Sequence, residues 1–158
     1  DQYQVVSHWH HFAILELADL QGFECEPAWI ARALGIPRAT AKASLERLKR
    51  LGLLIADGKH WKASTAFTAS PDGIPSQAIR DSHREILRAA TRAITKQGVD
   101  ERDLSNIILA VNSKDLPEAK KMIRTFRRGF NEHFSKSRSK DKVYCLAVQF
   151  FRLGEEKA

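Results

Sequence analysis

The fold is decided by residues 27–62, which read PAWIARALGIPRATAKASLERLKRLGLLIADGKHWK. Proline is favoured at the first position of a helix, so the chain is expected to become helical at Pro27. Gly35 suits the left-handed conformation that ends a helix and turns the chain. A second helix is expected from Arg38, because apolar residues recur there at spacings of four and three: Ala41, Leu45, Leu48 and Leu51.

A hairpin is expected directly after the second helix. Gly52 ends the helix, residues 53–56 read as a strand, and Asp57-Gly58 favours a tight turn before residues 59–63 return. Helix, turn, helix and hairpin form the order of a winged helix-turn-helix. In that unit the second helix enters the major groove of DNA and the hairpin lies on the flanking backbone. Pro37 replaces the Ser or Thr that often caps the second helix, so no capping hydroxyl is available for a phosphate.

The second helix and the hairpin carry the candidate DNA-binding residues. Residues 38–62 hold seven Lys or Arg against Glu46 and Asp57, a balance suited to phosphates. We expect the residues opposite the apolar stripe to face the major groove: Arg38, Thr40, Lys42, Ala43 and Arg47. We expect phosphate contacts from Lys49, Arg50, Lys59, His60 and Lys62. Arg38 and Lys42 are the best candidates for guanine, whose edge offers two acceptors.

The composition indicates a globular cytoplasmic protein. The 158 residues carry a net charge of +7, with 43% hydrophobic and 28% charged residues. No run is long enough to span a membrane, and no signal peptide pattern is found. Cys25 and Cys145 are isolated in the sequence and are expected to be reduced thiols. The chain starts at Asp1 without an initiator methionine, as a fragment of a longer protein would.

A further helix is expected before this region, from Ser7 to Leu20, with Ser7 as its cap. Its histidines His8, His10 and His11 suggest a metal site, but no acidic or cysteine ligand accompanies them at a suitable spacing. We therefore expect no metal and no other cofactor. Glycine-rich phosphate loops, a glycine-flanked serine and paired carboxylates are absent as well, so the chain is expected not to be an enzyme.

The rest of the chain predicts a second, α-β-α-β half. Residues 64–75 read as a linker, residues 76–97 as a long helix, and residues 114–134 as another helix. The apolar runs 104–111 and 143–151 are expected to be buried strands, paired in parallel across the second of these helices. Because two strands make a poor sheet, they need neighbours from the hairpin, from Thr65 to Thr68, or from another subunit. The predicted fold class is thus α+β, with a winged helix-turn-helix in residues 1–70 and a regulatory or dimerisation domain in residues 71–158.

The whole pattern resembles an uncharacterised bacterial family of winged-helix regulators, described as a domain of unknown function and seen in predatory and fibre-degrading bacteria. The resemblance is carried by short motifs spread over the chain: Trp9 and His11, Trp29-Ile30-Ala31, Leu34-Gly35-Ile36, Leu51-Gly52-Leu53, His83, Arg102-Asp103, Val143-Tyr144 and Gln149-Phe150-Phe151. It implies a regulator-like architecture and the carboxy-terminal portion of a longer protein. It supplies no catalytic residues.

Two functions are consistent with these patterns. The first is a transcriptional regulator that binds double-stranded DNA, with the residues after Ser76 as a candidate homodimer interface. The alternative is a protein-interaction or ligand-sensing module in which the winged helix is only a scaffold. Single-stranded nucleic acid on the basic helix faces at residues 80–92 and 120–128 ranks lowest, because aromatic residues for base stacking are not regularly spaced there. The effector and the DNA sequence are not indicated.

Overall fold

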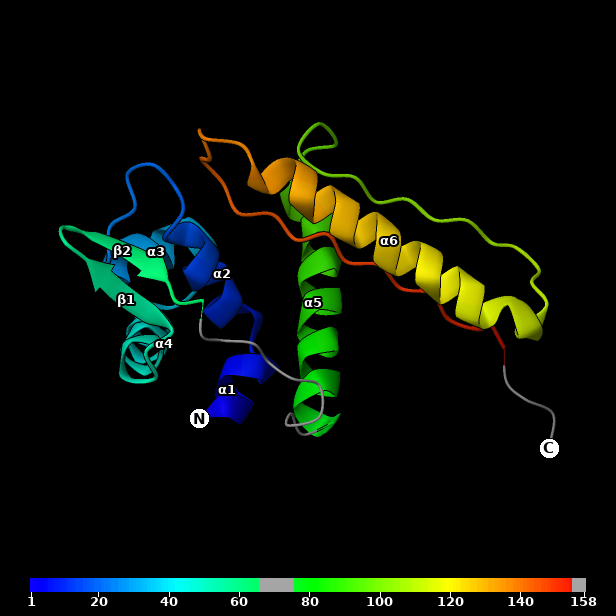
Figure 1. The fold of residues 1–158 in the computed structure, drawn as a ribbon, viewed down its shortest axis with the longest axis horizontal. Helices are drawn as coiled ribbons and strands as arrows, with labels where there is room; N and C mark the ends of the chain where they lie inside the picture. The colour runs from blue at the N-terminus through cyan, green and yellow to red at the C-terminus, as the bar shows by residue number, and fades with distance from the viewer. Residues whose placement is uncertain (66–75, 155–158) are drawn as a thin grey trace. The chain divides into compact units, whose positions relative to one another are not determined.

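The computed structural model describes residues 1–65 and 76–154 (Figure 1). Its elements, in chain order, are the helices α1 (Gln2–Ser7), α2 (Trp9–Leu17), α3 (Pro27–Leu34) and α4 (Arg38–Arg50), the strands β1 (Leu54–Asp57) and β2 (His60–Ala63), the long helix α5 (Ser76–Lys96), the short 3-10 helix η2 (Ser113–Asp115) and the helix α6 (Leu116–Ser135). The mixture of helices with a small sheet confirms the α+β class.

The junction between α3 and α4 forms as the sequence predicts. Pro27 occupies the start of α3, and Gly35 ends it in the left-handed region at φ +64°. Pro37 precedes α4 without any side-chain hydrogen bond to the free amides of its first turn. Ala41, Leu45 and Leu48 are buried in the core, as their spacing requires, whereas Leu51 is exposed. Two local backbone signals and one apolar stripe therefore fix this part of the fold.

The hairpin is the only sheet among the described residues, and it is antiparallel. Leu54 pairs with Ala63 and Asp57 pairs with His60, which leaves Gly58 and Lys59 as a two-residue loop. Gly58 has φ +62° and Lys59 does not have a positive φ, which is the pattern of a loop that begins with glycine. The register turns Leu54 into the core and leaves Trp61 half-buried against it.

The helix predicted from Ser7 to Leu20 is found as α2 (Trp9–Leu17), and a separate short helix, α1 (Gln2–Ser7), precedes it. His8 is extended between α1 and α2, so Ser7 ends α1 instead of capping α2. The Ser7 hydroxyl is buried and donates to the carbonyl of Tyr3 at 2.5 Å, one helical turn earlier. The expectation of a Ser7 cap is therefore wrong, because a serine hydroxyl can bond within its own helix as readily as it can cap the next one.

The chain divides into two compact units. Unit 1 comprises Asp1–Gly98 and Ser139–Val143, and unit 2 comprises Val99–Arg138 and Tyr144–Ala158. Unit 1 includes α5, which packs on α1 and α2: the Tyr3 hydroxyl donates to Asp81 at 2.5 Å, and Glu85 accepts from the backbone N–H of Trp9 at 3.1 Å. The first unit thus extends beyond residue 70, where we expected a boundary. That residue and most of the predicted linker lie outside the described residues.

Unit 2 differs most from the prediction. Residues 104–111 and 143–151 are extended, but neither forms a strand, and they are not paired with each other within the described chain. Most of their residues are exposed instead of buried. The expectation of a buried, parallel strand pair is therefore wrong for the chain by itself. An apolar run indicates that burial is favourable, but it does not say which surface supplies the cover.

Candidate nucleic-acid interface

The outer face of α4 carries the first group of predicted contact residues. Arg38, Lys42 and Ala43 are exposed there, and Thr40 is half-buried at the edge of the face. The burial of Ala41, Leu45 and Leu48 turns these side chains outward, as helical periodicity requires. Lys42 has one partner, Glu46, whose carboxylate lies 4.0 Å from its ammonium one turn along the helix. Such an exposed pair contributes little, so the face remains cationic.

Arg47 does not belong to this face. Its side chain is only 22% exposed, and its Nη1 donates to Nε2 of His11 at 3.0 Å. Its Nε lies 3.6 Å from the Asp1 carboxylate and has no hydrogen-bond partner among the described residues. The expected outward placement of Arg47 is therefore wrong. Ser44 and Arg47 flank the apolar stripe on the side that meets α2, where histidine side chains supply polar partners.

The end of α4 holds two of the predicted phosphate contacts, Lys49 and Arg50. Both are exposed. Arg50 donates to the Asp1 carboxylate at 2.8 Å, while the Lys49 ammonium lies 4.3 Å from the ring centre of Trp61. The second contact is a cation–π interaction that joins α4 to strand β2. Lys49 thus has a structural partner in addition to any role toward a phosphate.

The hairpin presents the remaining predicted contacts, Lys59, His60 and Lys62, all of them exposed. Lys62 pairs with Asp57 across the hairpin at 3.0 Å, in a pair where both side chains are more than half exposed. No ion pair of Lys59 or His60 is found in the described part of the chain. The tip of the hairpin can therefore approach an anion without first breaking a contact.

A cluster of three histidines borders α4 on the inner side, and sequence reasoning gave it no role. The rings of His8 and His10 stack at 5.4 Å between centres, and those of His10 and His11 lie 4.6 Å apart. His8 Nδ1 lies 2.8 Å from Glu85, and His10 Nδ1 lies 3.0 Å from the Ser44 hydroxyl. Each ring thus has a protein partner, and the described residues contain no group of three side chains that could hold a metal ion.

Burial sets the charge of this cluster. Desolvation is the main cause that lowers the pKa of His11, to about 4, and the neighbouring His10 lowers it further. The pKa of His10 is lowered for the same main reason. Both rings are therefore neutral at pH 7, and they add no charge to a shallow hollow of about 420 Å³ between α4 and the helices α1 and α2.

The structure brings most of the predicted residues onto two adjoining elements, α4 and the hairpin. Residues 1–153 match the family model of a domain of unknown function (DUF4423). The chain belongs to the DUF4423 family. A search of curated proteins and a search of solved structures each found no match. Within the described residues of this DUF4423 chain, no helix combines the length and the apolar character that crossing a membrane requires.

Proposed function

We propose that this DUF4423 chain is a DNA-binding transcriptional regulator, in which α2, α3, α4 and the hairpin β1–β2 act as a winged helix-turn-helix. The observation that carries the proposal is the outer face of α4, where Arg38 and Lys42 are exposed and the buried leucines hold the helix from behind. An exposed helix of this kind fits the width of the major groove.

The residues of this surface have different roles in the proposal. Arg38 and Lys42 offer donors for the two acceptors of guanine, while the methyl groups of Thr40 and Ala43 suit contact with thymine. Lys49, Arg50, Lys59, His60 and Lys62 contact phosphates, and the four Lys and Arg residues among them neutralise phosphate charge. Arg47 is left out of the contact set because its guanidinium lies against His11, where it positions α4 on α2.

Two of the phosphate-binding residues have to exchange partners on binding. Arg50 leaves Asp1 and Lys62 leaves Asp57, and both carboxylates then return to water. Exposed ion pairs of this kind contribute about 0 to 1 kcal/mol, so a phosphate replaces them at little cost.

The experiment is a selection of bound genomic DNA fragments, followed by fluorescence anisotropy on the selected sites between 50 and 200 mM salt. Arg38→Ala should cost about 1 to 3 kcal/mol and relax the preference for one base pair. Lys59→Ala should weaken binding to all sequences evenly and reduce the slope of log K against log salt by about 1. The control is Arg88→Ala, which removes an exposed arginine from α5 and should change neither quantity.

These measurements distinguish base reading by Arg38 from DNA binding as such. Equal losses on every sequence for Arg38→Ala and Lys59→Ala would remove the base-reading role of Arg38 and leave only non-specific binding. A wild-type chain that binds no fragment at 50 mM salt would reject the function itself.

A second candidate function is a protein-interaction or ligand-sensing module, with the helices and hairpin of unit 1 as a scaffold. It is favoured by the apolar side chains that unit 2 leaves exposed on α6 and on the extended segments beside it. A chain that is monomeric and silent toward DNA would support this function over the first. A dimer held by residues after Ser76 would support a regulator with paired half-sites.

A further inference from the structure

Unit 2 contains two extended segments whose backbones lack partners. No backbone hydrogen bond joins residues 104–111 or residues 144–151 to any other part of the described chain. Both segments are rich in residues favoured in strands and contain neither a charged residue nor a proline. Natural proteins usually place charged residues or prolines on an uncovered strand edge, because an unprotected edge tends to pair with another chain.

The apolar side chains of unit 2 are exposed as well. Of the 22 exposed large hydrophobic residues among those described, 17 lie in this unit, and none of its described residues is buried. Phe126, Phe130 and Phe134 form a row along α6, each ring centre within 5.9 Å of the next. Unit 2 thus has the amphipathic helix and the strand-forming segments of a sheet domain, but its described residues form no buried core.

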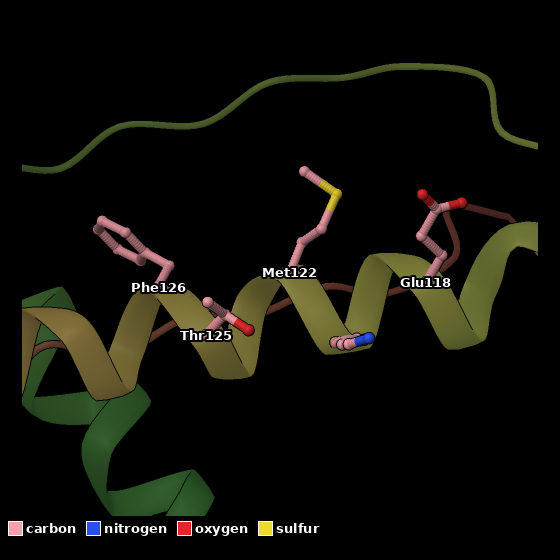
Figure 2. Close-up of a pocket in the computed structure, with 5 residues that line it drawn as sticks. Glu118, Met122, Thr125 and Phe126 are labelled. Carbon is pink, nitrogen blue, oxygen red and sulfur yellow. The ribbon is translucent and has the colours of Figure 1, made fainter.

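An open hollow lies along the exposed face of α6. It measures about 490 Å³ and is lined by α6 alone, through Glu118, Lys121, Met122, Thr125 and Phe126. Figure 2 shows Met122 and Phe126 pointing away from α6, on the side where an extended segment runs. Side chains on a helix that faces a complete sheet would fill such a space.

The path of the chain indicates that a β-strand fits between the two extended segments. Both extended segments run opposite to α6, and in Figure 1 they flank the helix instead of lying side by side. A helix with its side chains is about 10 Å wide, and neighbouring strands are about 4.8 Å apart. Two parallel strands that flank one helix therefore leave room for one strand between them, as in a split β-α-β unit.

We propose that unit 2 dimerises with a second copy of this chain, and that residues 104–111 of each copy pair antiparallel with residues 144–151 of the other. The result is a four-stranded antiparallel sheet in which the two segments of one copy enclose one strand of its partner. Both copies of α6 cover this sheet with their apolar rows, and Lys120, Arg124 and Arg127 remain in water on the opposite side of each helix.

Three observations favour a second copy as the occupant. Each copy lacks one strand between its segments and has two to offer, so two copies complete each other across a twofold axis. The uncharged segments can pair with themselves without like-charge repulsion. The two segments hold 16 residues, and the apolar side chains of α6 bring each partner's share close to the roughly 20 to 30 residues of a stable interface. The proposal does not depend on DNA binding, so either can fail without the other.

The first test measures mass by sedimentation equilibrium on the whole chain between 1 and 100 µM. Wild type should give twice the 17.9 kDa of one chain. Ile108→Lys places a charge in the sheet and should weaken dimerisation at least tenfold. Val99→Lys is the matched control, because Val99 is 75% exposed and Ile108 81%, but Val99 lies in a turn outside both segments. Both variants should retain the wild-type circular dichroism of the helices.

Hydrogen exchange decides what covers the segments. In the dimer, amides of residues 104–111 and 144–151 should be protected, and Ile108→Lys should remove that protection. A wild-type monomer at 100 µM would overturn the proposal, whether its amides exchange freely or are protected by another part of the chain. A dimer that Ile108→Lys and Val99→Lys leave equally stable would place the interface elsewhere and overturn it as well.

The second test determines which segments are neighbours. One copy carries Cys25→Ser, which leaves Cys145 as its only thiol, and a tagged copy carries Cys25→Ser, Cys145→Ser and Ile108→Cys. A short bismaleimide should link the two different copies through positions 108 and 145. Failure to link them in a mixture that sediments as a dimer would contradict the pairing.

Discussion

The neutral state of His11 gives the sharpest prediction for the stability of the fold. Its side chain is fully buried, with 0% of its surface exposed. Its Nε2 accepts from Arg47 at 3.0 Å, which leaves the proton on Nδ1, where it can point to the carbonyl of His8 at 3.3 Å. A second proton on the ring would face the guanidinium directly. Burial is the main reason why the pKa of His11 is lowered to about 4, and the neighbouring His10 and Arg47 lower it in the same direction.

The sign and size of the effect follow from linkage. The unfolded chain binds this proton with a pKa of about 6.5, while the folded chain resists it down to about 4. The stabilisation from a neutral His11 is thus fully present above pH 6.5 and is lost as the pH falls from 6.5 to 4. At 1.36 kcal/mol per unit of pKa the total is about 3 kcal/mol, of which about 2 kcal/mol disappears between pH 7 and pH 5.

The assay is urea unfolding followed by tryptophan fluorescence at pH 7, 6 and 5. His11→Gln keeps an amide oxygen for Arg47 but cannot titrate, so it should lower the stability at pH 7 and flatten the pH dependence by about 2 kcal/mol over this range. His60→Gln is the matched control on the exposed hairpin and should leave the slope unchanged. Parallel pH profiles for wild type and His11→Gln would refute the reasoning, because the protons taken up on unfolding would then bind to other groups.

Two further predictions concern the helices. Leu48→Ala should lower the free energy of unfolding, measured in urea, by about 2 to 5 kcal/mol, because Leu48 is fully buried in the core. Leu51→Ala on the same helix is the control and should cost under about 1 kcal/mol, because Leu51 is exposed. Gly35→Ala should cost about 1 kcal/mol in the same assay, because an added Cβ meets no atom within 4 Å and only the positive φ opposes the alanine. A cost above about 3 kcal/mol would indicate a packing role that the structure does not show.

The sequence was most informative where single residues control the backbone. Pro27 and Gly35 bound α3, Gly58 lies in the turn of the hairpin, and the leucine spacing orients α4. α5 was expected at residues 76–97 and runs over Ser76–Lys96. These features depend on local sterics and on helical period, which a sequence contains in full.

Sequence reasoning was less successful where a residue depends on what lies opposite it. Arg47 has the spacing of an edge residue, and only the packing of α2 against α4 shows that it bonds to His11 instead of facing outward. His8 and His10 gave a visible signal in the sequence, but their partners Glu85 and Ser44 are distant in the chain. The prediction that the apolar segments of unit 2 are buried strands was wrong for a related reason, because no other part of the described chain covers them.

The order in which the chain visits its two units limits how they can be separated. The chain leaves unit 1 after Gly98, returns at Ser139, and leaves again after Val143. On the returning stretch, Lys140 binds the Asp19 carboxylate at 2.7 Å, and its carbonyl accepts from the N–H of Gln21. Shortening the protein to its first 98 residues would therefore also remove a tie that fastens the loop after α2. An internal deletion that joins residue 98 to residue 139 through a flexible linker would keep that tie and is the better way to obtain unit 1 alone.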